Sequence, residues 1–490
     1  MRKLSLMPIA LAMLITGCTM EPHYHRPDAP VAASFPSGGV YQTGAPSKSS
    51  ERSANGQPAP DIGWRNFFVD ARLQELIAIA LKNNRDLRVS ALNIEAARAQ
   101  YQITRAGLFP AIDAAASQSK LRTPRDLSST PRTVSDVYSV GLNASWEIDF
   151  FGRIRSLKDQ ALAQYLATSQ ARKAAELSLV SEVADQYLTM IAYDELLEVT
   201  RDTLKTAQGS YGLTKLQFDN GTGSELDLRQ AQTVVDEAQA NLQAQERARA
   251  QAENSLVFLI GEPLPADLPP GATLDGQDLL EDIPAGLPSD LLSRRPDIIE
   301  AEENLLAANA NIGAARAAFF PKVSLTGNFG TLSPSLGGLF KPGSAAWGFG
   351  PQISVPIFAG GENRANLDLA NVQKNIQVAQ YEKAIQTAFR EVADGLAARG
   401  TYDQEIEARQ HDTLAEQRRL ELSELRYRHG VDSYLSVLTA QNDLYASRQS
   451  LITARMQRLT SLVDLYRALG GGWIERSGDE PRAADAPGVG

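Results

Sequence analysis

The sequence contains one cysteine and four histidines among 490 residues. The single cysteine, Cys18, excludes a disulfide within the chain and any metal site built from several cysteines. The histidines show neither HExxH nor paired ligand spacing, and the chain has no nucleophile elbow and no phosphate-binding loop. We therefore expect that the chain is not an enzyme, with no catalytic residues, no metal site and no bound cofactor.

Long apolar runs and an excess of basic residues are missing too. No run of 18 apolar residues follows the N-terminal region, so we expect no membrane-spanning helix in the mature chain. The formal net charge is −10. This charge argues against a nucleic-acid partner, because phosphate contacts require clustered lysine and arginine.

The N-terminus has the pattern of an export signal. Arg2 and Lys3 precede a short apolar stretch that ends in Leu14-Ile15-Thr16-Gly17-Cys18. This ending resembles the bacterial lipoprotein signal, in which the peptide is cut before the cysteine. We expect a signal peptide over 1–17, a covalent N-acyl and S-diacylglycerol lipid on Cys18, and a Pro- and Ser-rich lipidated arm over 18–62. Thr19, rather than aspartate, favours the outer membrane in that signal.

Two segments alternate apolar and polar residues with a period of two, which indicates β-strands. The expected β-hairpins cover 111–149 and 322–357, although Pro351 and Pro356 weaken the last strand. Strands of about ten residues fit an outer-membrane barrel, but the smallest closed barrels have about eight strands. Several copies would therefore have to share one barrel. The alternative is an antiparallel sheet with one face packed on helices and the other in water.

The chain contains an internal repeat. Arg105 and Arg316 begin similar strings 211 positions apart (316 − 105), and Glu182–Asp185 recurs unchanged as Glu391–Asp394. The repeat predicts a first unit at 63–261, a linker or equatorial segment at 262–286, a second unit at 287–470, and an equatorial or disordered tail at 471–490. Between the hairpins the composition predicts helices at about 66–107, 153–218, 224–260, 288–318, 362–428 and 433–469.

The last predicted helix carries a heptad seam, which indicates coiled-coil packing. The seam runs through Leu435, Leu438, Asn442, Tyr445, Gln449, Ile452, Met456, Leu459, Val463 and Tyr466.

Each long helix is expected to end in a short turn, at 219–224 and at 429–433. Gly221 and Gly430 can supply left-handed C-caps, and Ser224 and Ser433 can supply N-caps. These turns are either plain helical hairpins or contact points for another protein.

At this point the chain resembles the outer-membrane factor family of TolC/OprM type, in particular the lipoprotein branch of RND multidrug efflux channels. The resemblance extends from Cys18 to about Trp473. It rests on Asp61-Ile62-Gly63-Trp64-Arg65, Asn84-Arg85-Asp86-Leu87, Glu147-Ile148-Asp149-Phe150-Phe151-Gly152-Arg153, Gly286-Leu287-Pro288-Ser289-Asp290, Arg294-Arg295-Pro296-Asp297 and Ala314-Ala315-Arg316-Ala317-Ala318-Phe319-Phe320-Pro321.

The resemblance implies a mainly α-helical fold with a transmembrane β-barrel, made of two tandem repeats of helix, β-hairpin, long helix and helix. Three chains would form a twelve-stranded barrel and a long helical periplasmic tunnel. The implied function is the passive exit duct of a tripartite multidrug efflux pump, in the outer membrane and extending into the periplasm. The implied partners are two further copies, a periplasmic adaptor, an inner-membrane RND transporter and outer-membrane lipid. Two alternatives are a type I protein-secretion duct and a non-conducting structural coiled-coil lipoprotein.

The resemblance also implies site residues at the two turns. Its periplasmic gate maps onto Tyr427, Asp227, Asp432 and Leu435, with Tyr427 linked to Asp227. Family members often carry pore-facing acidic residues where this chain has Ser436 and Thr439, so an acidic ring would need Asp432 or Asp443 instead. The implied adaptor contacts are Gly221, Thr222, Gly223, Ser224, Gly430, Val431, Ser433 and Tyr434.

Overall fold

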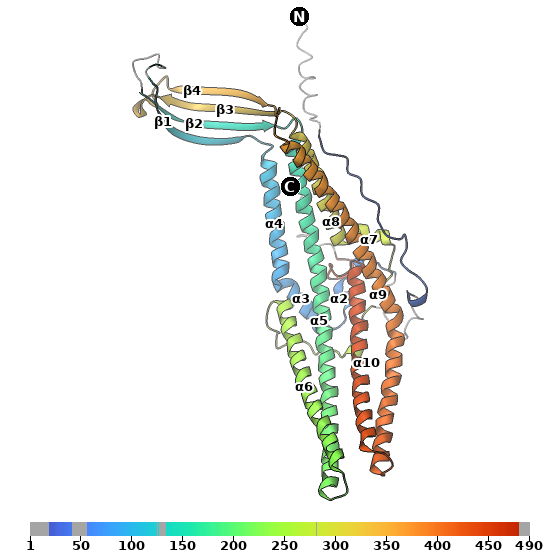
Figure 1. Ribbon diagram of the computed structural model, residues 1–490. Helices are drawn as coiled ribbons and strands as arrows, with labels where there is room; N and C mark the ends of the chain where they lie inside the picture. The colour runs from blue at the N-terminus through green and yellow to red at the C-terminus, as the bar shows by residue number, and fades with distance from the viewer. Residues whose placement is uncertain (1–18, 42–55, 125, 127–133, 281, 480–490) are drawn as a thin grey trace. The chain divides into compact units, whose positions relative to one another are not determined.

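A computed structural model describes residues 19–41, 56–124, 126, 134–280 and 282–479. The predicted signal peptide and Cys18 lie outside these residues. The described chain is mainly helical, and none of its helices combines the length and apolarity that a bilayer crossing requires. The helices are α2 (Trp64–Phe67), α3 (Ala71–Asn83), α4 (Arg85–Ala106), α5 (Arg153–Asp219), α6 (Glu225–Ile260), α7 (Pro288–Arg294), α8 (Pro296–Ala317), α9 (Glu362–Arg428) and α10 (Tyr434–Ala468) (Figure 1).

The four long helices α5, α6, α9 and α10 begin and end within two residues of their predicted bounds. The continuous helices predicted at 66–107 and 288–318 are wrong, because the chain breaks at Asp70, Asn84 and Arg295. Asp70 is extended and its carboxylate caps α3. Arg295 is also extended, as expected for a residue before a proline, whose ring disfavours the helical conformation of its predecessor.

The chain forms two compact units, and each unit contains parts of both sequence repeats. Unit 1 takes its described residues from 1–28, 93–169 and 300–382, and unit 2 from 29–92, 170–299 and 383–490. The repeats are therefore not separate compact bodies. The reason within unit 1 is that strands from the two repeats pair with each other.

Unit 1 contains one antiparallel sheet in the order β1-β2-β3-β4. Its strands are β1 (Ala111–Arg122), β2 (Val134–Ile148), β3 (Lys322–Ser333) and β4 (Ala345–Ser354). The last strand ends three residues earlier than predicted, before Pro356. Pro351 is accommodated inside β4, which is an edge strand of this sheet and so tolerates a missing amide donor.

The strand register joins the apolar sides of all four strands into one face. Ile112 lies opposite Ala144, Leu142 opposite Phe329, and Phe329 opposite Trp347. The large side chains on this face are exposed, and Trp347 keeps 79% of its surface accessible. None of the described helices covers the face, so the alternative of a sheet packed on helices is wrong.

In unit 2 the core forms around Tyr466 near the end of α10. Its ring stacks on Phe67 with centroids 4.0 Å apart, and its hydroxyl donates to the backbone oxygen of Ile62 at 2.6 Å. The segment at 59–62 of the predicted lipidated arm is therefore part of the core. The chain after α10 also packs here, because the Trp64 amide donates to the Ile474 oxygen at 3.0 Å.

The sequence predicts an equatorial or disordered tail at 471–490. The described part of this tail packs on the chain, because the Ser477 amide donates to Asn66 Oδ1 at 2.9 Å. Residues 480–490 lie outside the described part of the chain.

Asp70 joins three parts of unit 2. Its Oδ1 accepts from the amides of Arg72 and Leu73 in α3, while its Oδ2 accepts from the Tyr187 hydroxyl of α5 at 2.8 Å. Gln277 Nε2 also donates to Oδ2 at 2.8 Å and thereby attaches the 262–286 linker. Burial alone would raise the pKa of Asp70, but these hydrogen bonds outweigh it and lower the pKa.

The ends of α6 and α10 are held in equivalent ways. Asn84 Nδ2 donates to the Leu259 backbone oxygen at 2.8 Å. Arg295 Nη1 donates to the Ala468 backbone oxygen at 2.9 Å. Asn84 and Arg295 are 211 residues apart, and the two acceptors are 209 apart, so the contact is repeated with the sequence repeat.

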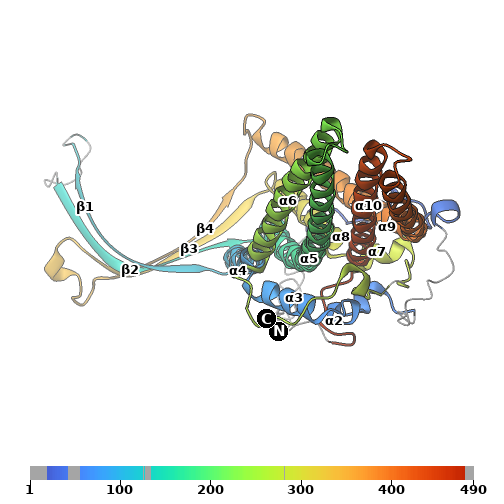
Figure 2. The same cartoon turned by 90° about the horizontal axis from the view of Figure 1, so that it is seen from below.

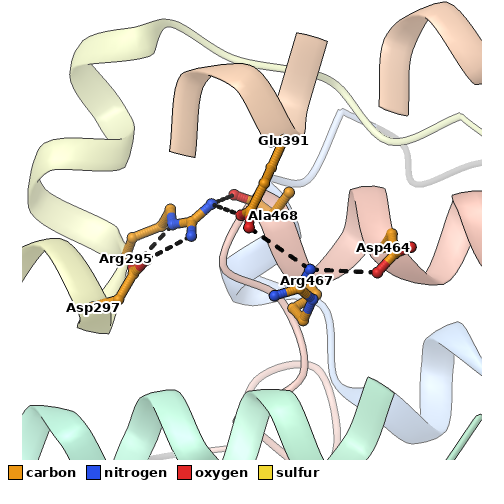
Figure 3. Close-up of polar contacts among 6 residues, drawn as sticks. All are labelled: Arg295, Asp297, Glu391, Asp464, Arg467 and Ala468. Carbon is orange, nitrogen blue, oxygen red and sulfur yellow. Dashed lines mark hydrogen bonds and ion pairs between the residues drawn. The ribbon is translucent and has the colours of Figure 1, made fainter. Parts of the chain in front are cut away.

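The second of these contacts belongs to a charged network (Figure 3). Arg295 binds both oxygens of Asp297, at 2.9 and 2.6 Å, and Glu391 Oε2 at 2.9 Å. Arg467 lies 3.9 Å from Glu391 Oε1 and 3.4 Å from Asp464 Oδ1. Asp185 of α5 also faces this network, and its Oδ1 is buried without a hydrogen-bond partner among the described residues. Burial, with the nearby charge of Asp464, raises the pKa of Asp185 to about 8.

Replacing Asp70 by asparagine should lower the free energy of unfolding by about 1–3 kcal/mol, because the amide cannot accept every hydrogen bond at this site. The lowered pKa of Asp70 means that its contribution is present above its unfolded pKa and is lost as the pH falls through the folded value. Denaturant unfolding measures both effects. Asp61→Asn is the control, because its carboxylate is 56% exposed and pairs with Arg294 at the surface. A smaller loss in Asp70→Asn than in the control would contradict the assignment.

Asp185 predicts a separate pH dependence. Its folded pKa is about 8 against an ordinary 3.8, so the folded state retains a proton that the unfolded state has lost between these values. Stability should therefore fall as the pH rises from about 4 to 8. Asp185→Asn should flatten this slope in thermal melts at pH 5 and 8, whereas Asp202→Asn, on the exposed side of the same helix, should not. An unchanged slope in Asp185→Asn would refute the assignment.

Candidate gate at the ends of the helical hairpins

The pairs α5/α6 and α9/α10 form two helical hairpins in unit 2, each closed by a short turn (Figures 1 and 2). Both turns end the first helix in the same way. The amides of Gly221 and Thr222 donate to the oxygens of Phe218 and Gln217, each at 2.9 Å. In the second turn Gly430 and Val431 donate to Tyr427 and Arg426, also at 2.9 Å. This pattern is the Schellman motif.

The left-handed conformation at both glycines confirms the predicted C-caps. Gly221 has φ 73° and Gly430 has φ 70°, values that side chains other than glycine rarely adopt. The N-cap prediction is confirmed for Ser224, whose hydroxyl accepts from the Asp227 amide at 3.0 Å. It is wrong for Ser433, whose side chain makes no cap hydrogen bond. The Ser436 amide donates instead to the Ser433 backbone oxygen at 3.1 Å.

Tyr434 lies in the packing between the two hairpins. Tyr434 is 2% exposed and belongs to an apolar cluster drawn from three helices. Tyr427 and Tyr211 pack against this cluster. Burial raises the pKa of Tyr434 to about 12. The Tyr434 side chain is inside the hairpin pair, and its contact with an adaptor stays a prediction. The cluster consists of Ala231, Leu420, Tyr434, Val437, Ala440 and Leu444.

The predicted heptad seam is wrong near the turn. Buried positions here are Tyr434, Val437, Ala440, Gln441 and Leu444. Leu435, the first predicted seam residue, is 54% exposed. The true seam is one residue out of register with the predicted one because the tyrosine, not the leucine, enters the apolar cluster. The predicted positions Ile452, Leu459, Val463 and Tyr466 are buried further along the helix.

Tyr427 connects the two hairpins through its hydroxyl group. This hydroxyl donates to Gln217 Oε1 of α5 at 3.1 Å, and the Tyr427 and Tyr434 rings lie 5.2 Å apart. Burial raises the pKa of Tyr427, with a smaller effect from the Asp227 charge. Among the described residues the Tyr427 hydroxyl is bonded to Gln217, and its link to Asp227 stays a prediction. Sequence reasoning missed Gln217, although it precedes the first turn as Arg426 precedes the second.

The two candidate acidic residues are paired with arginines of α9. Arg426 binds both oxygens of Asp432, at 2.5 and 3.1 Å, and lowers the pKa of Asp432 by hydrogen bonding. Arg419 binds Asp443 Oδ2 at 2.8 Å. An acidic ring built from these carboxylates would therefore include a compensating positive charge at each position.

The contact between the hairpins is incompletely filled. A cavity of about 90 Å³ lies beside Tyr427 and Tyr434, with Ser210, Leu213 and Thr214 of α5 on its other side. Such a volume holds a few water molecules and is far smaller than a ligand pocket. The space therefore suits water rather than a ligand.

Four exposed antiparallel strands combined with two long helical hairpins define a class of outer-membrane channel proteins. The model of the family described as outer membrane efflux protein matches residues 76–262 and 287–471, and the chain belongs to this family. It is accordingly an outer-membrane efflux protein. The two matched segments fall within the two sequence repeats to within one residue.

The chain is similar to named proteins along nearly its whole length. It is 49% identical over 483 residues to two proteins of Pseudomonas putida, the toluene efflux pump outer membrane protein TtgC and the antibiotic efflux pump outer membrane protein ArpC. Each match covers 98% of both chains. A solved structure, the open state of the Neisseria gonorrhoeae MtrE outer membrane channel, is 41% identical with a TM-score of 0.82. It matches over 94% of this chain and 100% of the other.

Neighbouring residues at the second turn provide a test of the packing. Tyr434→Ala should lower the free energy of unfolding by about 3–5 kcal/mol, because it leaves a cavity in the apolar cluster. Leu435→Ala should change it by no more than about 0.5 kcal/mol, since its side chain is exposed. Denaturant unfolding followed by circular dichroism compares the two variants. Equal losses would contradict the inward placement of Tyr434.

Proposed function

We propose that the chain is the passive exit duct of a tripartite multidrug efflux pump, a trimer that is gated at its periplasmic hairpin ends. The observation that carries this proposal is the exposed apolar face shared by β1–β4. An exposed face of this size requires an apolar environment, and the family lies in the outer membrane. A non-conducting coiled-coil lipoprotein would have no use for it.

The sheet edges support assembly of several copies. β1 and β4 each pair with one strand only, and unpaired edges are not tolerated in lipid. A closed barrel needs about eight strands or more. Three copies would supply twelve, with β1 of one copy pairing with β4 of the next.

The helices that continue from these two edges carry exposed apolar stripes. Along α4, which leads into β1, the stripe contains Val89, Leu92 and Ile103. Along α9, which follows β4, it contains Leu369, Val372 and Ile376. The spacing suits helix packing in a heptad pattern. If the α4 stripe of one copy packs on the α9 stripe of the next, and the same rotation relates every pair of neighbours, the copies form a closed ring.

The gate and the adaptor contact are proposed for the two turns. Gly221, Thr222, Ser224, Gly430, Val431 and Ser433 lie at the surface and can meet a periplasmic adaptor. The Tyr427–Gln217 bond and the cavity beside it suit a contact that opens when the hairpins separate. The solved MtrE structure is of an open state, so a related channel can open.

We place the substrate selection outside this chain. Two relatives have the same sequence identity to this chain, yet one is named for toluene and the other for antibiotics. The cargo in these names therefore does not follow the degree of similarity to this chain. An inner-membrane RND transporter would choose the cargo, and this chain would conduct it. A lipid on Cys18 would anchor each copy, and no enzymatic step is involved.

The proposal predicts a conducting trimer. The purified protein in detergent should have the mass of three chains and should give single-channel currents in a planar bilayer. Gly330→Val should abolish both, because a Cβ at Gly330 would collide with the Val140 backbone oxygen across the β2–β3 pair. Gly337→Val is the matched control, because open space surrounds Gly337. A wild-type monomer without conductance would overturn the proposal.

A further inference from the structure

The first described residues of the N-terminal arm lie along α8 within unit 1. The Met20 backbone oxygen accepts from Arg316 Nη1 at 3.3 Å, and the Pro22 oxygen accepts from Asn309 Nδ2 at 2.8 Å. Tyr24 and Arg26 both reach Glu302. The arm therefore runs antiparallel to α8, contacting it at successively earlier positions.

The spacing of these contacts fits an extended arm. Arg316 and Glu302 are 14 residues apart, which is about 21 Å along a helix. Met20 and Arg26 are six residues apart, which is about 20–22 Å in an extended chain. The two lengths are similar, as expected for an extended segment that follows the helix.

Glu302 is the central residue of this contact. Arg26 Nε donates to Oε1 at 2.7 Å and Nη2 to Oε2 at 2.5 Å, while the Tyr24 hydroxyl donates to Oε1 at 3.0 Å. The Glu302 residue is only 8% exposed. A two-pronged arginine contact to a shielded carboxylate is both strong and specific in geometry.

α8 also provides room for the arm backbone. Asn309 is fully buried, and its side-chain amide donates to the backbone oxygen of Pro22. This hydrogen bond does not depend on which side chain the arm carries at position 22. At Gly313 an added Cβ would lie 2.5 Å from Ser156 Oγ of α5 and 3.0 Å from both the backbone nitrogen and the Cα of Glu21. A larger residue at position 313 would therefore crowd both α5 and the arm. These features fit α8 to the backbone of the arm.

We propose that residues 19–26 form a strap that sets the level of the N-terminal lipid against the end of α8, and that Glu302 holds this strap. The proposal rests on the proposed function only for the lipid on Cys18. Met20 is held by Arg316, six residues before β3 begins at Lys322. Met20 is thus held near the start of this strand, and Cys18 precedes Met20 by two residues in the sequence. A load on the lipid would be transmitted to α8 through the strap.

Release of the strap can be measured by chymotrypsin, which cleaves after tyrosine and can act between Tyr24 and His25 when the segment is free. Full-length protein in detergent should resist this cleavage. Glu302→Ala should accelerate it about tenfold, corresponding to about 1.4 kcal/mol. Glu303→Ala is the matched control and should leave the rate unchanged. Exchange of the two charges, Arg26→Glu with Glu302→Arg, should restore part of the resistance. Equal rates in wild type and Glu302→Ala would overturn the strap.

The level of the lipid needs a second measurement. A fluorophore on Met20→Cys in vesicles, quenched by lipids brominated at known depths, should report one narrow depth in the wild-type background. Glu302→Ala should broaden this depth profile, and an unchanged profile would overturn the positioning role. Mass spectrometry of the N-terminal peptide establishes the lipid, and its absence would overturn the lipid-level claim. Conductance of the same samples is separate: a protein that keeps its strap but never conducts would refute only the proposed duct.

Discussion

The C-terminal carbonyl groups of α6 and α10 impose the constraint on which unit 2 depends. A helix leaves its last carbonyl groups without partners inside the helix, and a buried end must satisfy them. The Asn84 side chain donates a hydrogen bond to the carbonyl of Leu259, and the Arg295 side chain donates one to the carbonyl of Ala468. Each hairpin is thereby fixed by a residue that comes from the beginning of its own repeat.

This constraint explains why the helices that begin each repeat are broken. Asn84 and Arg295 can project their side chains toward the ends of α6 and α10 because the chain leaves the helical conformation at both residues. At Gly261 a Cβ would collide with the Asn83 backbone oxygen, so the returning chain passes very close to the break. A single unbroken helix at either place would leave the end of a hairpin without its partner.

The sequence was sufficient for the elements that depend on local pattern. Strand alternation, the composition of the four long helices and the glycine caps at Gly221 and Gly430 are local signals, and the structure confirms them. The features that the sequence did not predict depend on contacts between residues far apart in the chain. The heptad pattern of α10 fits two registers, and only the packing against α6 and α9 selects the one that buries Tyr434. The seat of the arm on Glu302 joins residues 276 positions apart, and no local pattern marks it.

The two repeats close their hairpins with different chemistry. In the first repeat a neutral amide, Asn84, makes the contact. In the second repeat Arg295 makes it and draws Asp297 and Glu391 into a charged network that Asp185 also faces. A neutral amide adds no charge to a buried helix end, whereas a buried guanidinium group has to be paired with carboxylates. At the same place in the repeat, the end of α6 is therefore held by a neutral contact, and the end of α10 by a charged network that lies close to the buried Asp185.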